Sequence, residues 1–115
     1  MELSMTARAE AGHTVLEIGG EIDVYTAPQL REELQRLIGE GATDIVVDLS
    51  RVDFIDSSGL GVLAGIHRRL RSLDGSLRLV YSHERLLKIF RITGLDSVFD
   101  IYDSVDAATA AGQSR

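Results

Sequence analysis

The chain has 115 residues, of which 44% are hydrophobic, and its formal net charge at pH 7 is −6. This length suits one globular domain with one core, and the acidic balance argues against nucleic acid, whose phosphates bind clustered Lys and Arg. Without cysteine there is no disulfide or thiol chemistry, and without an apolar run of signal-peptide or membrane-span length we expect a cytoplasmic protein with no membrane partner.

The first twenty residues predict a β-hairpin. Residues 3–9 alternate apolar and polar side chains, and residues 14–18 form a second short run of strand type. A turn at Gly12 separates the two runs by few enough residues for the strands to pair. We expect Gly19–Gly20 to end the second strand.

The next segment has the spacing of an amphipathic helix. Apolar side chains recur at helical intervals across residues 27–38,. Thr26 is suited to the N-cap, with Gln29 three residues later completing a capping box. Gly39 or Gly41 should end the helix.

The middle of the chain predicts a buried strand, a connector and a second helix. Residues 45–49 form a near-continuous apolar run, which is typical of a strand covered on both faces,. Residues 50–55 are expected to be a connector, and the helix should run from the following serines to about residue 73. Its expected buried side chains are Leu60, Leu63, Ile66, Leu70 and Leu73.

The last third repeats the alternation of strand and helix. We expect a strand at residues 77–81, a helix capped by Ser82 and closed by Gly94, and a strand at residues 98–102. Ser104 should cap a final helix. The pattern predicts one α/β domain over residues 1–115, with its core at 3–111, a frayed tail at 112–115, and a mixed sheet layered with about four helices.

The junction after the connector carries the most unusual chemistry. An acid and two hydroxyls, Asp56, Ser57 and Ser58, stand at the start of the second helix. Unpaired N–H groups and the helix dipole favour anions there, so a phosphoryl group on a serine would be held by the backbone. The structural alternative is that one of the two serines is simply the N-cap. If Ser58 caps the helix, Ser57 is left free, and the residues alone leave this open.

Four stretches carry a resemblance to a known family. The sequence DSSGLG at residues 56–61 resembles the phosphorylation motif of the anti-sigma factor antagonists, which are single STAS domains of bacterial regulatory networks. Residues 20–23 look like that family's loop after the second strand. Residues 24–28 and 88–95 are similar to its actinobacterial members, so the resemblance spans nearly the whole chain.

The resemblance implies a STAS fold and a regulatory function without catalysis, cofactor or metal. By the family pattern the phosphorylated residue is Ser57, with Ser58 as the alternative. The implied partners are an anti-sigma factor that is an ATP-dependent serine kinase, bound by the unphosphorylated form to release a sigma factor, and a PP2C-type phosphatase. The implied partner-binding residues are Asp23, Asp56, Ser57, Ser58, Gly59, Leu60 and Gly61.

Three glycines and one further acid have two readings each. Gly59, Gly61 and Gly65 are costly inside a helix, so either the helix packs closely on the sheet or a partner's backbone must approach it. Asp53 is more readily a solvated loop acid than part of the site. A Mg²⁺ site at Asp23, Asp53 and Asp56 is disfavoured, because a kinase brings its own metal with ATP.

Two other functions compete. A two-component receiver domain needs an acidic pair after the first strand and a lysine after a later one; here the first strand lacks that pair, and the only lysine, Lys88, lies within a helix. A STAS subunit of a lipid transporter or stress-signalling assembly would not need a phosphorylated Ser57.

Overall fold

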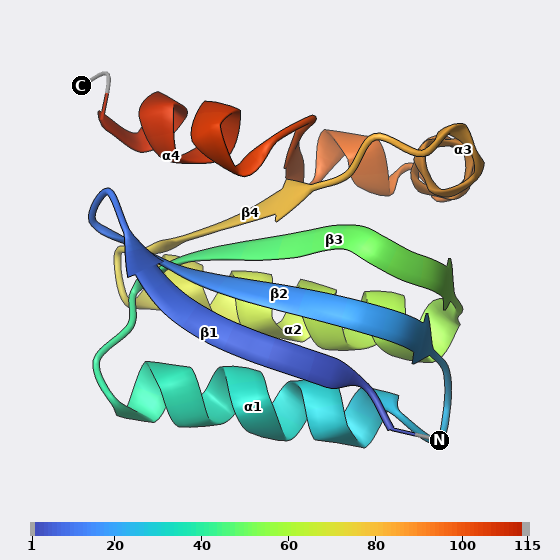
Figure 1. Cartoon of the computed structure of the whole chain (residues 1–115), viewed down its shortest axis with the longest axis horizontal. Coiled ribbons are helices and arrows are strands. Elements are labelled where there is room, and N and C mark those ends of the chain that lie inside the picture. The colour runs from blue at the N-terminus through green and yellow to red at the C-terminus, as the bar shows by residue number, and fades with distance from the viewer. Residues whose placement is uncertain (1, 114–115) are drawn as a thin grey trace.

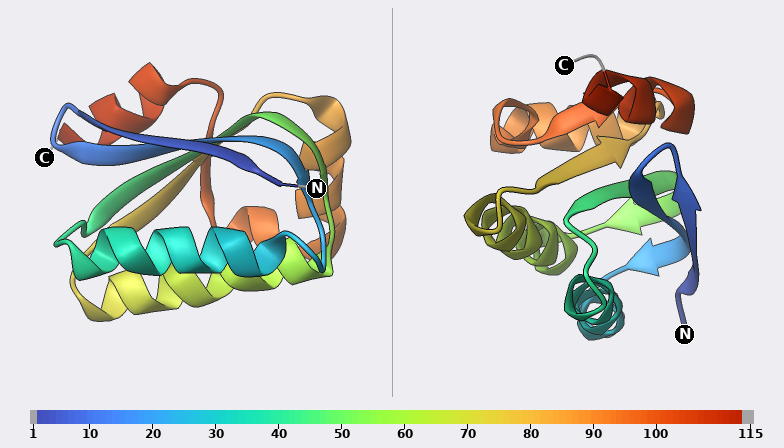
Figure 2. Two further views of the ribbon diagram at one scale, coloured as in Figure 1. Left: turned by 60° about the horizontal axis from the view of Figure 1, so that its bottom comes forward. Right: turned by 90° about the vertical axis from the view of Figure 1, so that its left-hand side faces the viewer.

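The computed structural model describes residues 2–113, which form a five-stranded sheet with helices on both of its faces (Figures 1 and 2). The elements in chain order are β1 (Ser4–Glu10), β2 (His13–Ile22), α1 (Ala27–Gly39), β3 (Asp44–Ile55), α2 (Ser57–Ser72), β4 (Ser76–Val80), α3 (Glu84–Thr93), a 3₁₀ turn (Leu95–Ser97), β5 (Asp100–Tyr102) and α4 (Val105–Gln113). The prediction of an α/β domain with about four helices is confirmed. No helix in this described part is long and apolar enough to cross a membrane.

The sheet is mixed, as the sequence predicts. Its strand order is β1-β2-β3-β4-β5, with β1 antiparallel to β2 and every later pair parallel. The hairpin turn places Ala11 and Gly12 at φ 52° and 81°, a left-handed conformation that suits glycine at the second position,. After this hairpin, β2 to β5 run parallel, so their carboxyl ends all lie at the same edge of the sheet.

Two apolar layers hold the domain together. Helices α1 and α2 lie side by side against one face of the sheet, and α4 covers part of the other (Figure 2). In β3, Ile45 and Val47 face the α1–α2 layer, whereas Val46 packs with Ala108 of α4. Because successive side chains of a strand point to opposite faces, both layers need apolar residues, and this confirms the double burial predicted for residues 45–49.

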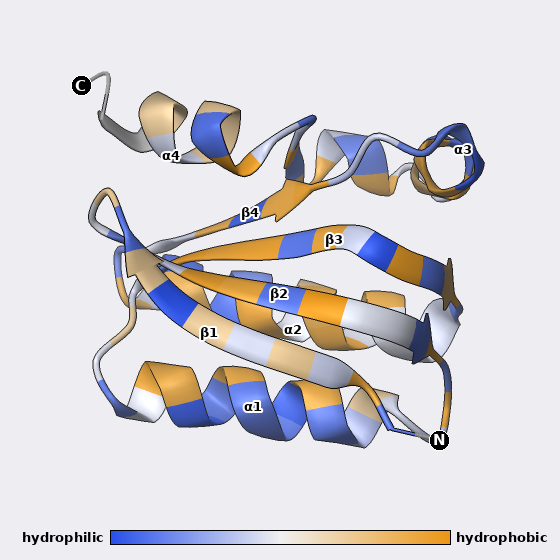
Figure 3. Cartoon of the chain, in the orientation of Figure 1, coloured by the Kyte–Doolittle hydropathy of each residue, from blue (hydrophilic) through white to orange (hydrophobic). Residues whose placement is uncertain are grey.

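The boundaries predicted for the two central strands are wrong. Residues 50–55 belong to β3, and Gly19 and Gly20 lie inside β2. At two register shifts, between Glu17 and Gly19 and between Gly20 and Glu21, β3 contains one residue more than β2. Each extra residue is a bulge that breaks the alternation of facing side chains. In Figure 3, β3 is largely hydrophobic in its first half and changes repeatedly between hydrophilic and hydrophobic in its second.

The predicted capping box of α1 is also wrong. Thr26 stands at the N-cap position, but its side chain makes no cap hydrogen bond. Its Oγ1 instead donates to the Glu21 carbonyl at 2.8 Å and accepts from the Asp23 N–H at 2.9 Å. The Gln29 side chain accepts from the Leu3 N–H and does not reach back to Thr26. The loop before α1 therefore uses the hydroxyl that would otherwise cap the helix.

The later caps follow the sequence in two cases of three. The N-cap of α3 is His83, not Ser82, and it makes no side-chain cap bond. Gly94 ends α3 with φ 75°, as expected. Ser104 Oγ accepts from the Ala107 N–H at 3.1 Å, which confirms the cap predicted for α4.

Three end positions differ from expectation. Leu73 is 46% exposed, because α2 ends at Ser72 and the side chain leaves the buried stripe. The last strand begins only at Asp100, although Phe99 before it is buried in the core. Of the tail predicted to fray, residues 112–113 belong to α4 and residues 114–115 lie outside the described residues.

Candidate functional site

The predicted site lies where β2 and β3 end together. The Asp56 N–H donates to the Ile22 carbonyl at 3.1 Å and so ties the end of β2 to the start of α2. Asp23 follows Ile22 directly, and Ser57 follows Asp56. The carboxyl edge of parallel strands is where open α/β sheets place their binding sites. The fold thus brings Asp23, Asp56 and both serines to one end of the molecule.

Asp56, not a serine, caps α2. Its backbone is extended, with φ −108° and ψ −173°, and its Oδ1 accepts from the Ser58 N–H at 2.8 Å and the Gly59 N–H at 3.3 Å. Its carbonyl accepts from the Leu60 N–H at 3.0 Å. A carboxylate at this position satisfies orphan amides and suits the positive end of the helix dipole.

Because Asp56 is the cap, neither serine hydroxyl is needed to hydrogen-bond the first amides of α2. Neither Ser57 nor Ser58 makes a side-chain hydrogen bond with any residue from 2 to 113, so the expectation that one serine caps α2 is wrong. The two differ in exposure, because Ser57 is exposed and Ser58 is half-buried. Ser57 therefore offers the more accessible hydroxyl.

The amides at the start of α2 are mostly occupied. Asp56 takes the N–H groups of Ser58, Gly59 and Leu60 through its side chain or its carbonyl. A phosphoryl group on Ser57 would therefore find few free amides and would stand next to a carboxylate. The expectation that the helix terminus would hold it through unpaired N–H groups is not met by this geometry.

Asp23 organises the loop between β2 and α1. Its Oδ1 accepts from the Thr26 N–H at 3.0 Å and the Tyr25 N–H at 2.9 Å. The Thr26 N–H, followed by the Tyr25 N–H and the Thr26 hydroxyl, holds the pKa of Asp23 below its ordinary value against the opposing effect of desolvation. The carboxylate is thus charged at neutral pH and fixes the backbone that carries Val24 and Tyr25.

Three large apolar side chains lie exposed at the same end, and they are here called the apolar patch. Val24 is 60% exposed, Tyr25 is 83% exposed and Phe54, two residues before Asp56, is 45% exposed. Burying such side chains on a partner would remove apolar area from water. A contiguous apolar patch marks an interaction surface, whereas single exposed apolar residues are normal. Sequence reasoning missed the patch, although two adjacent apolar residues in an expected loop were a usable signal.

Comparison with known proteins identifies the family. The family model described as the STAS domain matches residues 4–108. The chain belongs to the STAS domain family. An anti-sigma-B factor antagonist of Bacillus subtilis is 41% identical to this STAS domain over 101 residues, which are 88% of this chain and 92% of the relative.

Solved structures agree with this assignment. The crystal structure of an anti-sigma factor antagonist from Mycobacterium paratuberculosis matches with a TM-score of 0.87 and 29% identity, covering 95% of this chain and 92% of that one. Bacillus SpoIIAA in its phosphorylated form matches with a TM-score of 0.70 and 25% identity, covering 94% and 99% of the two chains. Within the STAS family this domain therefore groups with the anti-sigma factor antagonists, including an actinobacterial one.

The glycines of α2 in this STAS domain divide into two kinds. A Cβ on Gly59 would overlap Ile22 Cγ2 and lie 2.8 Å from Ile55 Cγ1, so close packing on the sheet requires glycine there. A Cβ on Gly61 would meet nothing within 4 Å, and one on Gly65 would reach only the Arg68 guanidinium at 4.0 Å. Packing within the described residues therefore explains the first glycine and not the other two.

The other two candidate residues differ in burial. Leu60 is 7% exposed and belongs to the core, so its contribution to a surface is to position its neighbours. Asp53 is exposed. Across residues 2–113, no three acidic or histidine side chains gather in a way that could hold a metal ion.

Proposed function

We propose that this STAS domain is an anti-sigma factor antagonist. In its unphosphorylated form it binds an anti-sigma factor that is an ATP-dependent serine kinase, and this binding releases the sigma factor. The kinase phosphorylates Ser57 and so ends the interaction, and a PP2C-type phosphatase restores it. The domain supplies the acceptor hydroxyl and the docking surface, and no catalytic group.

The observation that carries the proposal is the state of Ser57. Its side chain is exposed and makes no hydrogen bond with the described residues, because Asp56 provides the helix cap. A kinase can therefore reach the hydroxyl without breaking a structural contact. The comparisons support the same reading, since the Bacillus subtilis and Mycobacterium paratuberculosis relatives are named anti-sigma factor antagonists and SpoIIAA was solved in a phosphorylated form.

The surroundings of Ser57 support docking as well as phosphorylation. The apolar patch lies at the same end of the sheet and offers buried area to a partner, while Asp23 and Asp56 keep the two loops in fixed conformations. A preorganised surface loses less entropy on binding than a mobile one. We infer that the partner contacts the exposed backbone at Gly61 and four side chains, those of Asp23, Asp56, Ser57 and Ser58. Gly59 and Leu60 are buried, and they position these residues by packing the first turn of α2 against the sheet.

The receiver-like alternative is not supported. Receiver domains have a fully parallel doubly wound sheet of order 2-1-3-4-5, whereas this sheet runs in sequence order and opens with an antiparallel hairpin. Its phosphate would also be an acyl phosphate on aspartate. A phosphate that resists hydroxylamine is therefore part of the expected result below.

The test is phosphorylation by the anti-sigma factor kinase of the same organism. Incubation with the kinase and ATP should place one hydroxylamine-resistant phosphate on the wild-type protein and on Ser58→Ala, and none on Ser57→Ala. Phosphate mapped to Ser58 would reassign the acceptor and keep the function. Absence of both transfer and stable binding of the kinase would favour the alternative, a STAS subunit of a lipid transporter or stress-signalling assembly.

A further inference from the structure

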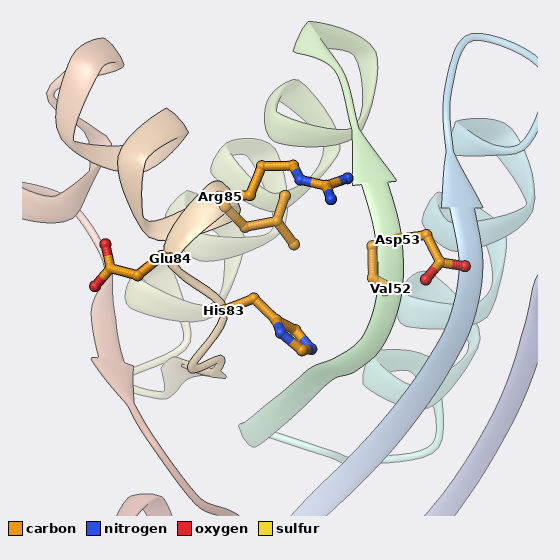
Figure 4. A pocket seen from close by; sticks show the side chains of 6 residues that line it. Val52, Asp53, His83, Glu84 and Arg85 are labelled. Carbon is orange, nitrogen blue, oxygen red and sulfur yellow. The ribbon is translucent and has the colours of Figure 1, made fainter.

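The free edges of the sheet differ in how they are protected from pairing with another chain. On one side the edge strand is β5, which has only three residues. β3 extends past β4, because their pairing ends at Asp48 and Val80, and the start of α3 covers this extension. In Figure 4 the His83 side chain lies across a small pocket from Val52, and its Nε2 is 3.2 Å from the Ser50 carbonyl. Short length and coverage both protect a sheet edge.

The opposite edge, formed by β1, has neither protection. β1 has seven residues, contains no proline or lysine, and pairs with β2 without a bulge from Ser4 to Glu10. Its two charged side chains are engaged on the same chain, since Arg8 pairs with Glu10 and Glu17. Within residues 2–113 no strand pairs with its outer side, and in the right-hand view of Figure 2 no helix or strand lies beyond it. A long, regular edge of this kind is a template for another strand.

The hairpin turn fixes which backbone groups of β1 point outward. The turn has two residues, so Glu10 and His13 on either side of it form a hydrogen-bonded pair,. Such pairs alternate along an antiparallel ladder. The N–H and C=O groups of every second residue therefore face away from β2, and these residues are Met5, Ala7 and Ala9. The Leu3 N–H, next in this series, donates to Gln29 Oε1 of α1 at 3.3 Å and so confirms the direction.

The same edge also leaves apolar side chains uncovered. Met5 packs partly against the core on the α1 side of the sheet, so Ala7 and Ala9 point to that side as well, yet both are exposed. Two openings lie between β1 and α1, with volumes of about 500 and 360 Å³. Met5 lines the first, and Ala7 and Ala9 line the second. Helix α1 therefore does not cover the inner face of the edge strand.

We propose that a second copy of this chain pairs with the β1 edge, antiparallel and about a two-fold axis through Ala7. The outward-facing residues are symmetric about this position. Ala7 lies opposite Ala7 of the second copy, and Met5 lies opposite Ala9, so every free N–H and C=O between them finds a partner. The contact is self-complementary and closed, as a two-fold dimer requires. It joins the two sheets into one.

The charges on the open face of the sheet favour this register. Arg8 lies opposite Thr6 of the second copy and Glu10 lies opposite Ser4, so no like charges face each other. Because Thr6 pairs with Glu17 within each copy, Glu17 of the second copy stands in the same row as Arg8. Moving the second copy by two residues toward the hairpin turn would instead set Arg8 opposite Arg8, which is destabilising.

Association also closes the openings beside β1, because the α1 helices of the two copies come to lie side by side under the joined sheet. On each copy the walls of these openings carry three glutamates and one arginine, which are Glu32, Glu33, Glu40 and Arg36. These walls repel each other, so added salt should strengthen the dimer. The Ser57 site follows β3, two strands from this edge, and the dimer leaves it free. The inference therefore does not rest on the proposed function.

The test is sedimentation equilibrium of the full chain from about 10 μM to about 1 mM, a range that resolves weak dimers. The mass should rise reversibly from 12.6 kDa toward twice that value. Ala7→Lys sets two like charges on the axis, and Ala7→Pro removes an N–H that faces away from β2. Each should raise the dimer Kd by about tenfold or more. Ala110→Lys adds the same charge at an exposed position of α4 and should leave the Kd within about twofold.

Two controls make the result decisive. Urea midpoints, measured on dilute protein, show that each variant folds. Amide hydrogen exchange tests the register, because the N–H groups of Met5, Ala7 and Ala9 should become protected as the protein concentration rises. A monomer at the highest concentration, a dimer that neither Ala7 variant weakens, or a dimer whose β1 amides stay unprotected would overturn the proposal. Growth beyond a dimer, weakening by salt, or protection of the β1 edge only by an anti-sigma factor would overturn it as well.

Discussion

Asp56 Oδ1 accepts a hydrogen bond from the Ser58 backbone N–H at 2.8 Å, so the residue before the serine pair caps α2. This contact has two consequences for Ser57. Its hydroxyl is released from any capping role, and a fixed carboxylate stands beside it. A kinase can therefore reach the Ser57 hydroxyl, and a phosphate added to it would lie near the negative charge of the Asp56 carboxylate.

Replacing Asp56 tests the cap. Asp56→Ala leaves the amides of Ser58 and Gly59 without their acceptor, and loss of an N-cap should lower the free energy of unfolding by about 0.5–2 kcal/mol. Asp56→Ser is the matched control, because a hydroxyl at the same position can still accept from these amides. Urea unfolding measures both. Equal destabilisation by the two variants would contradict the capping role.

The two glycines of the first turns form a second matched pair. Gly59→Ala places a methyl group against Ile22 and Ile55, and such overpacking should cost about 1–3 kcal/mol. Gly61→Ala meets open space and should stabilise the helix by up to about 1 kcal/mol. If Gly61 serves a partner's close approach, this stabilised variant should nevertheless bind the anti-sigma factor more weakly. Unchanged binding would leave that glycine without a role in docking.

The buried stripe of α2 gives a direct stability test. Leu63 is fully buried, so Leu63→Ala should cost about 2–5 kcal/mol through lost burial and a new cavity,. Leu73→Ala removes the same atoms from a side chain that is 46% exposed and should cost much less. Similar denaturation midpoints for the two variants would mean that the helix faces are assigned wrongly.

The order and type of the elements could be predicted from the sequence because the apolar spacing is strong in each of them. The ends of the central strands could not, because bulges between β2 and β3 change which side chains face the core. The alternation of apolar and polar side chains shifts twice along β3, so residues 50–55 are predicted to be a connector, although Val52 and Ile55 are buried. Pairing with a neighbour, which the pattern does not contain, keeps residues 50–55 in the strand.

The candidate site shows the same limit in its polar residues. The resemblance to the anti-sigma factor antagonists predicts that Asp23, Asp56 and the serines share one site, and the fold brings them to one end of the sheet. The sequence could not show that Asp56 rather than a serine caps α2, because all three side chains are good caps. Thr26 is a similar case. Its hydroxyl could accept from an N–H of α1 or bond to the backbone of the preceding loop, and the conformation of that loop determines which bond forms.

Asp23 predicts a pH dependence. Its pKa is held below the ordinary value, first by the Thr26 N–H, so its stabilising effect is complete above about pH 4 and is lost as pH falls through the lowered pKa. Asp23→Asn keeps an acceptor oxygen but does not titrate. Its free energy of unfolding should therefore fall less steeply than that of the wild type below pH 4. Asp53→Asn, an exposed control, should follow the wild-type slope.

Phosphorylation of Ser57 should act on binding and leave the fold intact. The modification adds about −1.5 to −2 charges, and it does so at an exposed side chain that makes no structural hydrogen bond with the described residues. Water can hydrate the phosphate, so the melting temperature of the free domain should change little. The nearby Asp56 carboxylate makes any effect a small loss of stability.

In the complex with the partner, water cannot hydrate the phosphate as it does on the free domain. The partner surface would bind a neutral hydroxyl beside the apolar patch, and a phosphate introduced there should weaken binding by about 2–5 kcal/mol, a factor of roughly thirty or more. Ser57→Asp should reproduce part of this loss, and Ser57→Ala should bind the kinase persistently. Kinase affinity and melting temperature, measured on the wild type, both variants and the phosphoprotein, separate the two effects. Unfolding on phosphorylation, or an unchanged affinity, would show that local repulsion at Asp56 is not how the switch works.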